Sequence, residues 1–309
     1  MNRKGVVGWI LGTVGCTLLG YVWLTPDRPA HAASSGVYAM VSELSPGSPY
    51  VYAIDSSTGN VTATLGVSGG TSGNGVPLGS TNGRGIAVIG GTIYYTTNGS
   101  NKVYTYTISP PTDNGVLFTV TSALGGLSSV AFDGTDLWLA DQTTNSAYQY
   151  TLTGVPVKTI TLANASGGYV GLEYFKTPTG QGRLIANRGR YSKVYDIYDL
   201  NGNLITPAFI TTTGIGTNGI AWDGTNFLIA NVFNISIDTY SGTTGGTAPI
   251  SSVSVVKPTG DPLPPLEDIS LVYTINPTPV PTLGQWGLIF CGVLLLGAGI
   301  LMSRKPANA

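Results

Sequence analysis

A short pattern that recurs every 42 to 49 residues constrains the fold of this chain more than any other feature. Each copy is a run of small and apolar residues, and the five copies begin at Gly85, Ser129, Gly171, Gly219 and Asp268. The spacings between successive copies are 44, 42, 48 and 49 residues. A period of this length is typical of proteins built from repeated structural units.

Each repeat holds signals for four β-strands. The first run leads into a tight turn, as at Gly90-Gly91, Asp133-Gly134 and Asp223-Gly224, dipeptides that favour type I′ hairpins. A second apolar run follows, then an alternating run such as Val103 to Ile108, and then a fourth strand such as Val116 to Val120. Alternation with a period of two, bounded by Gly, Asn and Asp, is the signature of strands. Four strands in about 45 residues predict the blade of a β-propeller.

The two ends of the array predict how the propeller closes. The first unit, from Val37 to Leu65, lacks an innermost strand, whereas the last unit supplies only an innermost strand, Asp268 to Tyr273. Placing that strand in the incomplete first blade gives a closed, all-β ring of about five blades, without the free sheet edges that promote aggregation. The long polar stretch from Gly66 to Arg84 leaves six blades as the alternative.

The N-terminus has the features of a secretory signal peptide, which we assign to residues 1–32. Arg3-Lys4 is followed by an apolar segment from Val6 to Leu24 and by the small-residue site Ala30-His31-Ala32. Cleavage there by signal peptidase would leave a propeller ectodomain of residues 33–275. Because the apolar segment is long, an uncleaved signal anchor is the alternative.

The C-terminus contains an apolar segment long enough to cross a membrane. Residues 276–282 form a Pro-rich spacer, and the twenty residues from Leu283 to Met302 carry no charge. Trp286 near the start of this segment and Arg304-Lys305 behind it are interface anchors, with the basic pair on the cytoplasmic side. Residues 283–309 are therefore predicted to form a transmembrane helix with a basic tail, and the propeller is predicted to lie across the membrane from that tail.

The start of this segment resembles the IPTL-CTERM sorting domain, whose members read Ile-Pro-Thr-Leu-x-x-Trp-Gly before an apolar helix and a basic tail. Val280 stands in place of the Ile, and the matching residues are Pro281, Thr282, Leu283, Trp286 and Gly287. The resemblance implies export in a Gram-negative bacterium and processing by an exosortase-type membrane peptidase. The protein would be anchored in the membrane transiently and would then lie at the cell surface or outside the cell. A plain C-terminal membrane anchor is the alternative.

The composition of the ectodomain excludes the commonest kinds of catalytic site. The two cysteines, Cys16 and Cys291, lie in the terminal apolar segments, and the single histidine, His31, precedes the predicted cleavage site. A Ser-His-Asp triad, a Cys-His pair and a His-ligated zinc site therefore cannot form in it. Residues 33–280 contain fourteen acidic and nine basic residues, a net charge of −5, which argues against a nucleic-acid partner.

Polar residues that follow the second strand in four of the repeats are candidates for a ligand site: Asn98, Asp141, Asn187 and Asn231. In a propeller these loops gather at one mouth of the central channel. They would lie near the residues that begin the innermost strands, namely Arg84, Ser128, Asn218 and Glu267. The alternative is that the Asn and Asp side chains bond to the backbone at the strand ends.

Glu173 replaces an alanine that three other repeats share at the equivalent position. A carboxylate on an innermost strand needs a partner to offset its desolvation. Arg188 and Arg190, in the loop of the same repeat, are the nearest candidates in sequence. The first interpretation of Glu173 is therefore a structural ion pair with one of these arginines.

The Asp-Gly-Thr triplets at Asp133 and Asp223 could be taken for calcium ligands. Their place in the first hairpin of each blade predicts a turn function instead. A calcium loop needs oxygen ligands at dense, fixed spacing, and the sequence has no such Asp-rich run. We therefore expect no cofactor, with calcium as the alternative.

The repeat also resembles the NHL and YVTN-type propellers of secreted bacterial proteins, which have short blades and Asp-Gly turns. Some related propellers are lactonases or lyases with a channel metal held by carboxylates and Asn, a set that Glu173, Asn218 and Asp268 could imitate. Two hypotheses follow from the sequence. The first is a non-enzymatic exported propeller that binds a surface protein or polysaccharide, and the second is a metal-dependent hydrolase or lyase.

Overall fold

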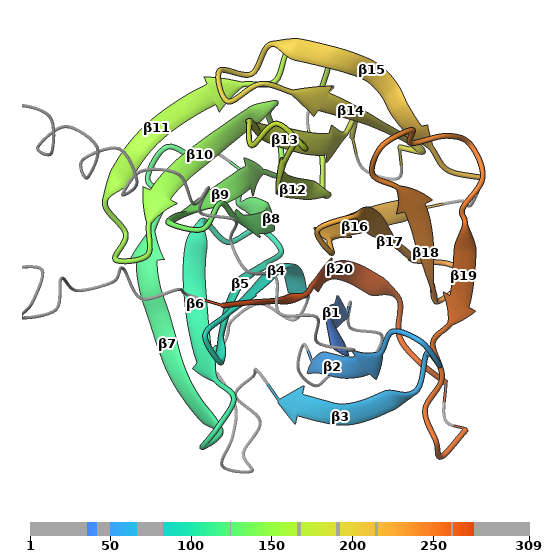
Figure 1. The fold of residues 1–309 in the computed structure, drawn as a ribbon. Coiled ribbons are helices and arrows are strands. Elements are labelled where there is room, and N and C mark those ends of the chain that lie inside the picture. The colour runs from blue at the N-terminus through green and yellow to red at the C-terminus, as the bar shows by residue number, and fades with distance from the viewer. Residues whose placement is uncertain are drawn as a thin grey trace, which may run out of the picture. The chain divides into compact units, whose positions relative to one another are not determined.

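The computed structural model describes residues 36–41, 50–66, 83–123, 125–165, 168–189, 192–213, 216–260 and 262–274. Throughout these ranges the regular elements are β-strands, and they form five sheets around a central axis (Figure 1). The described chain is therefore an all-β propeller of five blades, as the repeat predicted. The six-blade alternative is wrong for this part of the chain.

Each blade has four antiparallel strands, ordered from the axis outward (Figure 1). Blade 1 consists of β20 (Leu266–Ser270), β1 (Gly36–Val41), β2 (Tyr50–Asp55) and β3 (Val61–Gly66). Blade 2 consists of β4 (Gly83–Ile89), β5 (Thr92–Thr97), β6 (Lys102–Thr107) and β7 (Thr112–Thr119). Blade 3 consists of β8 (Leu127–Phe132), β9 (Asp136–Asp141), β10 (Ser146–Thr151) and β11 (Pro156–Thr161). Blade 4 consists of β12 (Leu172–Lys176), β13 (Gly182–Asn187), β14 (Val194–Tyr198) and β15 (Leu204–Thr211). Blade 5 consists of β16 (Thr217–Trp222), β17 (Asn226–Asn231), β18 (Ser236–Ser241) and β19 (Ser251–Ser254).

Side-chain burial falls from the axis to the periphery. The inner strands β4, β8 and β20 are buried along their whole length, whereas the outer strands β7 and β19 are largely exposed. An inner strand is covered on both faces by the neighbouring blades, so its sequence is a run of small and apolar residues without alternation. Apolar side chains of adjacent blades pack into shared clusters, such as Val103 of blade 2 with Leu137 of blade 3.

The first hairpin of blade 2 has the predicted type I′ geometry. Gly90 and Gly91 have φ angles of 54° and 84°, and they join Ile89 and Thr92, which pair across the two strands. Two consecutive residues with positive φ define this turn, and glycine adopts the conformation without steric cost.

The Asp-Gly turns differ from this prediction. Asp133 begins a turn of four residues, 133–136, and its Oδ1 accepts the backbone N–H groups of Thr135 at 2.9 Å and Asp136 at 2.8 Å. Asp223 accepts the equivalent two N–H groups in blade 5. A two-residue type I′ hairpin is therefore wrong at these positions. The predicted turn function of the two aspartates is confirmed, because each carboxylate bonds to the backbone of its own turn.

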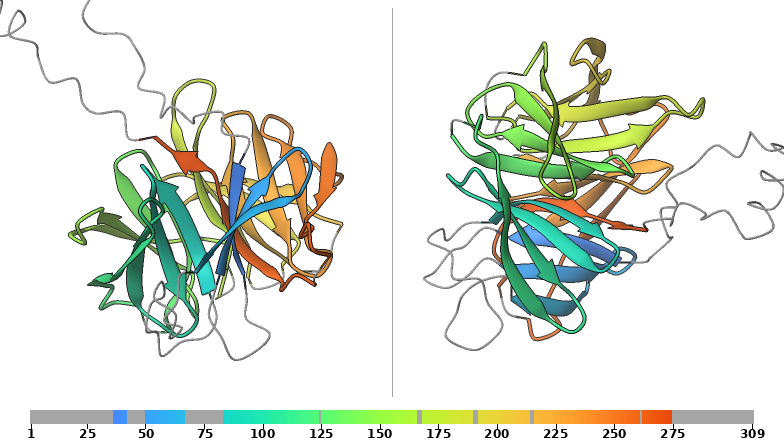
Figure 2. Two further views of the ribbon diagram at one scale, coloured as in Figure 1. Left: turned by 90° about the horizontal axis from the view of Figure 1, so that it is seen from below. Right: turned by 90° about the vertical axis from the view of Figure 1, so that its left-hand side faces the viewer.

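The C-terminal strand closes the ring in the predicted blade. β20 pairs antiparallel with β1, so that Ile269 lies opposite Ala39 and Ser270 lies opposite Tyr38. Figure 2 shows β20 and β1 side by side, although more than two hundred residues separate them in the sequence. The first described strand and a strand near the C-terminal end of the described chain are therefore joined in one sheet.

The predicted closing strand, Asp268 to Tyr273, is in fact two strands. β20 ends at Ser270, and the chain then crosses to blade 2, where β21 (Val272–Tyr273) pairs in parallel with Val88 and Ile89 of β4. We call residues 266–273 the closing segment. It belongs to two blades at once, so it joins the first blade to the second as well as completing the first.

Glycines let the inner strands approach one another closely. A Cβ atom at Gly171 would lie 2.0 Å from the backbone oxygen of Asn218, and one at Gly219 would lie 2.3 Å from the Cα of Asp268. Real side chains do not tolerate such distances, so these positions require glycine. The inner strands consequently leave little room at this level of the axis.

The two ends of the axis can be told apart by the chain direction. Arg84 lies at the start of β4, and we call that end the mouth end. Tyr273 lies beside the end of β4, where its carbonyl accepts the N–H of Gly90 at 3.0 Å. The described chain thus stops, at Thr274, at the opposite end, which we call the exit end.

Several predictions fall outside the described residues. The signal peptide of residues 1–32, the spacer of residues 276–282 and the helix and tail of residues 283–309 are all among them. In the ranges that the structure does describe, no helix is long and apolar enough to span a membrane.

Candidate functional site

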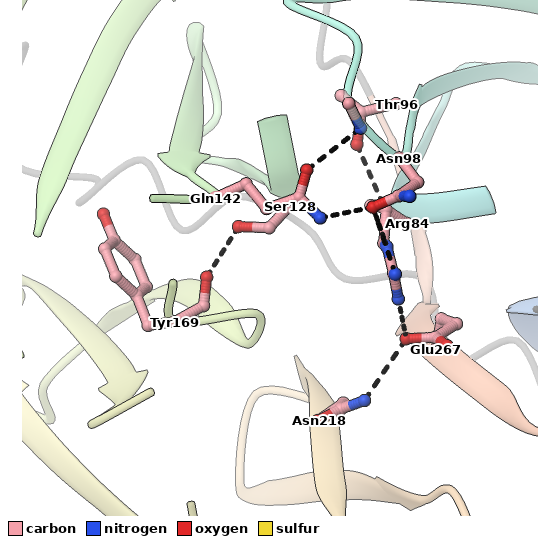
Figure 3. A network of polar contacts seen from close by, with 10 residues as sticks. Arg84, Thr96, Asn98, Ser128, Gln142, Tyr169, Asn218 and Glu267 are labelled. Carbon is pink, nitrogen blue, oxygen red and sulfur yellow. Dashed lines mark hydrogen bonds and ion pairs between the residues drawn. The ribbon is translucent and has the colours of Figure 1, made fainter. Parts of the chain in front are cut away.

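Residues from four blades meet at the mouth end of the axis. Arg84, Asn218 and Glu267 are the second residues of β4, β16 and β20, and Gln142 follows β9 directly. Figure 3 shows these side chains pointing toward one another, together with Asn98 from the loop after β5. We call these five residues the mouth network.

A buried ion pair is the centre of the mouth network. Arg84 Nη1 lies 2.7 Å from Glu267 Oε2, and the two side chains are only 2% and 6% exposed. Asn218 Nδ2 donates to the same carboxylate oxygen at 3.2 Å. Glu267 therefore ties blade 1 to blade 2 through a charge and to blade 5 through an amide.

The remaining guanidinium nitrogens of Arg84 bond to Asn98 of the same blade, and Asn98 in turn contacts Gln142 of blade 3. Nε and Nη2 donate to Asn98 Oδ1 at 3.3 Å and 3.2 Å, and Gln142 Nε2 donates to that same oxygen. Gln142 Oε1 accepts the N–H of Gly99 at 3.0 Å. The guanidinium is thus bonded on both sides by protein groups, which is how a buried charge is tolerated.

Ser128 extends the polar contacts to blade 4. Its hydroxyl donates to the backbone oxygen of Tyr169 at 2.6 Å, in the segment that leads into β12 (Figure 3). All four residues predicted to begin innermost strands, Arg84, Ser128, Asn218 and Glu267, are buried here. Three of them bond to one another, and Ser128 bonds to backbone.

The four predicted loop residues are used in two ways. Asp141 Oδ1 accepts the N–H groups of Thr143 and Thr144, and Asn231 Oδ1 accepts that of Asn234. Asn187 Oδ1 accepts the N–H groups of Val170 and Gly171. These three side chains bond to backbone at the strand ends, whereas Asn98 accepts from side chains in the mouth network.

Asn187 is not structurally equivalent to Asp141, although the sequence aligns them. In blade 3, Ala140 pairs with Ser129, whereas in blade 4 it is Asn187 whose N–H bonds to Gly171, the counterpart of Ser129 in the repeat. The second strand of blade 4 is therefore displaced by one residue. A shift of one residue turns every side chain of a strand to the other face.

A second polar group lies deeper on the axis and contains two carboxyls, Glu173 and Asp268. Glu173 accepts the hydroxyl of Tyr273 at 2.9 Å and 2.8 Å on its two oxygens, and the N–H of Tyr174 at 2.8 Å. Asp268 accepts the N–H groups of Ile86 and Ile269 and the hydroxyl of Ser129, at 3.0 to 3.2 Å. We call Glu173 and Asp268 the axial carboxyls.

The predicted ion pair between Glu173 and Arg188 is wrong. Arg188 bonds to both oxygens of Asp196 at 2.7 Å and 2.9 Å, on the adjacent strand β14. Asp196 also accepts from Asn164 and from the backbone of Ala208. Arg190, the other predicted partner, lies outside the described residues.

Burial changes the acidity of both axial carboxyls. Desolvation raises the pKa of Glu173 to about 8, against the lowering effect of its hydrogen bonds from Tyr273 and Tyr174. Desolvation also raises the pKa of Asp268 well above its usual range, and the nearby Glu173 raises it further. The exposed fractions are 2% for Glu173 and 1% for Asp268. Burial thus favours the protonated form of both carboxyls.

The arrangement offers little for a channel metal. Asn218, the third member of the imagined metal set, bonds to Glu267 and not to an axial carboxyl. Across the ranges that the structure describes, no three His, Cys, Asp or Glu side chains are grouped so that they could hold an ion. The oxygens of Asp268 are already occupied by donors, which a cation would have to displace.

Three residues of these networks were not predicted from the sequence. Gln142 reaches the neighbouring blade 2 and Tyr273 reaches across the axis to blade 4, and the repeat pattern carries no signal for such contacts. Ser129 did carry a signal, because it stands where three repeats have glycine. Its hydroxyl donates to Asp268.

Comparison with known proteins identifies one feature of the chain. The IPTL-CTERM motif matches residues 278–304, so the chain carries that sorting motif at its C-terminus, as its residues predicted. The motif covers a small part of the chain and does not describe the propeller. No curated protein shows significant sequence similarity to the chain.

Several solved structures are similar to the chain at low identity. A glutaminyl cyclase from Myxococcus xanthus has a TM-score of 0.43 and 11% identity, with 62% of this chain and 70% of that chain covered. A nidogen/laminin complex has a TM-score of 0.49 and 9% identity, covering 76% and 97%. A protein of unknown function from Bacteroides caccae has a TM-score of 0.43 and 12% identity, covering 72% and 73%. Scores this low say nothing about the function of this chain.

Replacing Arg84 with Met is expected to lower the free energy of unfolding by about 3–5 kcal/mol, because Glu267 would be left buried without a compensating charge. Urea denaturation of the exported protein measures the loss. Arg183→Met is the control, since Arg183 is half-buried and hydrogen-bonds to Gly182 and Gln181 of its own hairpin, and its charge interacts with the little-buried carboxylate of Asp199. A loss at Arg84 no larger than that at Arg183 would contradict a structural role for the mouth network.

Proposed function

We propose that this chain is an exported β-propeller that acts at the cell surface or in the extracellular matrix as a binding protein for a protein or polysaccharide. The observation that carries the proposal is the combination of a C-terminal sorting motif, at residues 278–304, with a closed propeller. A sorting motif and a propeller together support an exported surface protein. The binding role is the further step that we propose.

The inventory of the axis supports binding over catalysis. Cys16, Cys291 and His31 all lie in the predicted terminal segments, so the propeller has neither thiol nor imidazole. The charged mouth residues Arg84 and Glu267 neutralise each other, and the axial carboxyls are buried. The alternative, a metal-dependent hydrolase or lyase, would need these carboxyls to be open to substrate.

The mouth end is the surface that we propose for ligand binding. The described chain leaves the ring at the exit end, so the sorting tail is attached there. The mouth end carries the loops between second and third strands, including the exposed Asn98 and, after β17, Phe233, which is 58% exposed. An exposed aromatic ring and amide groups suit contacts with a sugar or a peptide.

We further propose the route of the protein. The signal peptide directs export and is removed by signal peptidase, while the C-terminal helix, with Arg304 and Lys305 on the cytoplasmic side, holds the protein transiently in the inner membrane of a Gram-negative bacterium. An exosortase-type peptidase then reads the motif around Pro281 and Trp286 and removes the helix. The sorting motif supports this route.

Binding is tested by a screen of the exported protein against surface glycans and secreted proteins, with and without a chelator. We expect a ligand whose binding is unchanged by the chelator and is weakened at least tenfold by Phe233→Ser. Val155→Ser is the matched control, because Val155 is also an exposed apolar residue but lies in the hairpin of blade 3 at the exit end. Binding that requires a divalent ion, or turnover of a lactone or glycan, would favour the enzyme alternative.

Processing is tested by intact mass. We expect the exported protein to begin near Ala33 and to lack the residues after about Trp286. Pro281→Ala and Trp286→Ala should each leave the precursor in the membrane fraction, because a peptidase that reads the motif would no longer recognise it. Mature wild-type protein that still contains Leu288 to Met302 would support a plain membrane anchor instead.

A further inference from the structure

The closing segment makes polar contacts with all four of the other blades. Glu267 bonds to Arg84 of blade 2 and Asn218 of blade 5. Asp268 bonds to the N–H of Ile86 in blade 2 and to Ser129 in blade 3. Tyr273 reaches Glu173 of blade 4. Three side chains within seven residues thus fasten the whole ring.

Three of these contacts involve an axial carboxyl, Glu173 or Asp268, that has no positive partner among the described residues. Around the axial carboxyls, the titratable groups are the two carboxyls themselves, Tyr273, and the ion pair of Arg84 with Glu267 at the mouth end. The other inner strands contribute small residues at the level of Glu173, namely Ala87, Ala131, Ala221 and Ser270. No described arginine or lysine is bonded to either axial carboxyl.

Ionising a carboxyl therefore costs more free energy at the axial carboxyls than it would beside the Arg84 guanidinium at the mouth end. A neutral carboxyl accepts the Tyr273 hydroxyl or a backbone N–H without a net charge on the axis. Two ionised carboxyls would place two like charges in a buried region, where desolvation and mutual repulsion both oppose them. The contacts that close the ring are consequently compatible with the protonated carboxyls and strained by the ionised pair.

We propose that ring closure depends on protons: protonated Glu173 and Asp268 hold the closing segment in the ring, and loss of these protons releases residues 266–273. This proton dependence is a property of the fold and does not depend on the proposed binding function. The released residues directly precede the sorting tail in the sequence, so their release would change the exit end of the ring.

The direction of the pH effect follows from linkage. The pKa of Glu173 is raised to about 8 in the folded ring, from an ordinary value of 4.5. Between these two values the closed ring binds a proton that the opened chain does not. Closure is therefore most favourable below the ordinary value and weakens as pH rises toward about 8. Each proton involved changes the equilibrium by about tenfold per pH unit in this window.

Hydrogen exchange of the full chain in detergent micelles, measured by mass spectrometry at pH 5 and pH 8.5, tests the proposal. After correction for the intrinsic pH dependence of exchange, we expect peptides covering 266–273 to lose at least tenfold in protection at the higher pH. Peptides from the outer strands β7 and β15 provide the internal reference. Equal protection of the closing segment at both pH values would overturn the proposal.

The variant Glu173→Gln tests whether the pH dependence of protection comes from the axial carboxyls. The amide is neutral at every pH and still offers an oxygen to Tyr273, so most of the pH dependence should disappear. Asp223→Asn is the matched control: Asp223 lies in an exposed turn, and the amide oxygen can still accept the two N–H groups that Asp223 binds. A loss of protection in Glu173→Gln as large as in the wild type would contradict the proposal.

A second variant keeps the test decisive if Glu173→Gln does not fold. Tyr273→Phe removes a hydrogen bond that lowers the pKa of Glu173, so the release should move to higher pH. If the pH at which protection of the closing segment is half lost were the same in Tyr273→Phe as in the wild type, Glu173 would not control that segment.

Discussion

The propeller depends on the closing segment, because its side chains make polar contacts with each of the other four blades. β20 completes the first blade, β21 adds a strand to the second, and Glu267, Asp268 and Tyr273 reach the remaining three. A ring of sheets opens wherever one blade boundary is weak. Because so many contacts lie in residues 266–273, closure of the ring depends on this one short segment.

The same contacts decide what the axis can do. The glycines on the inner strands bring the backbones close together, and the space that remains is taken by the axial carboxyls and their donors. At the mouth end, the ion pair of Arg84 and Glu267 uses its hydrogen-bonding groups on protein partners. The polar residues that first suggest a channel site thus hold the ring together, which moves the search for a ligand to the exposed loops of the mouth end.

The sequence was informative about the fold because its signals are periodic and local. Five inner runs at nearly regular spacing and an unpaired strand at each end predict a closed ring of five blades. The partners of Glu173 were not predictable, because Tyr273 comes from a strand that crosses between blades, while Arg188 is taken by Asp196. The displacement of Asn187 could not be seen in the sequence either. The residue types of blades 3 and 4 align, but the pairing registers of their second strands differ by one residue.

The dependence of the ring on its closing segment is tested most directly by thermal melting of two shortened forms of the exported protein. Both begin at Ala33; one ends after Pro265 and the other after Thr274, so that they differ by the closing segment and one further residue. We expect the longer form to melt in a single cooperative transition and the shorter form to lose that transition at the same pH and salt. An equal Tm in the two forms would contradict the central role of residues 266–273.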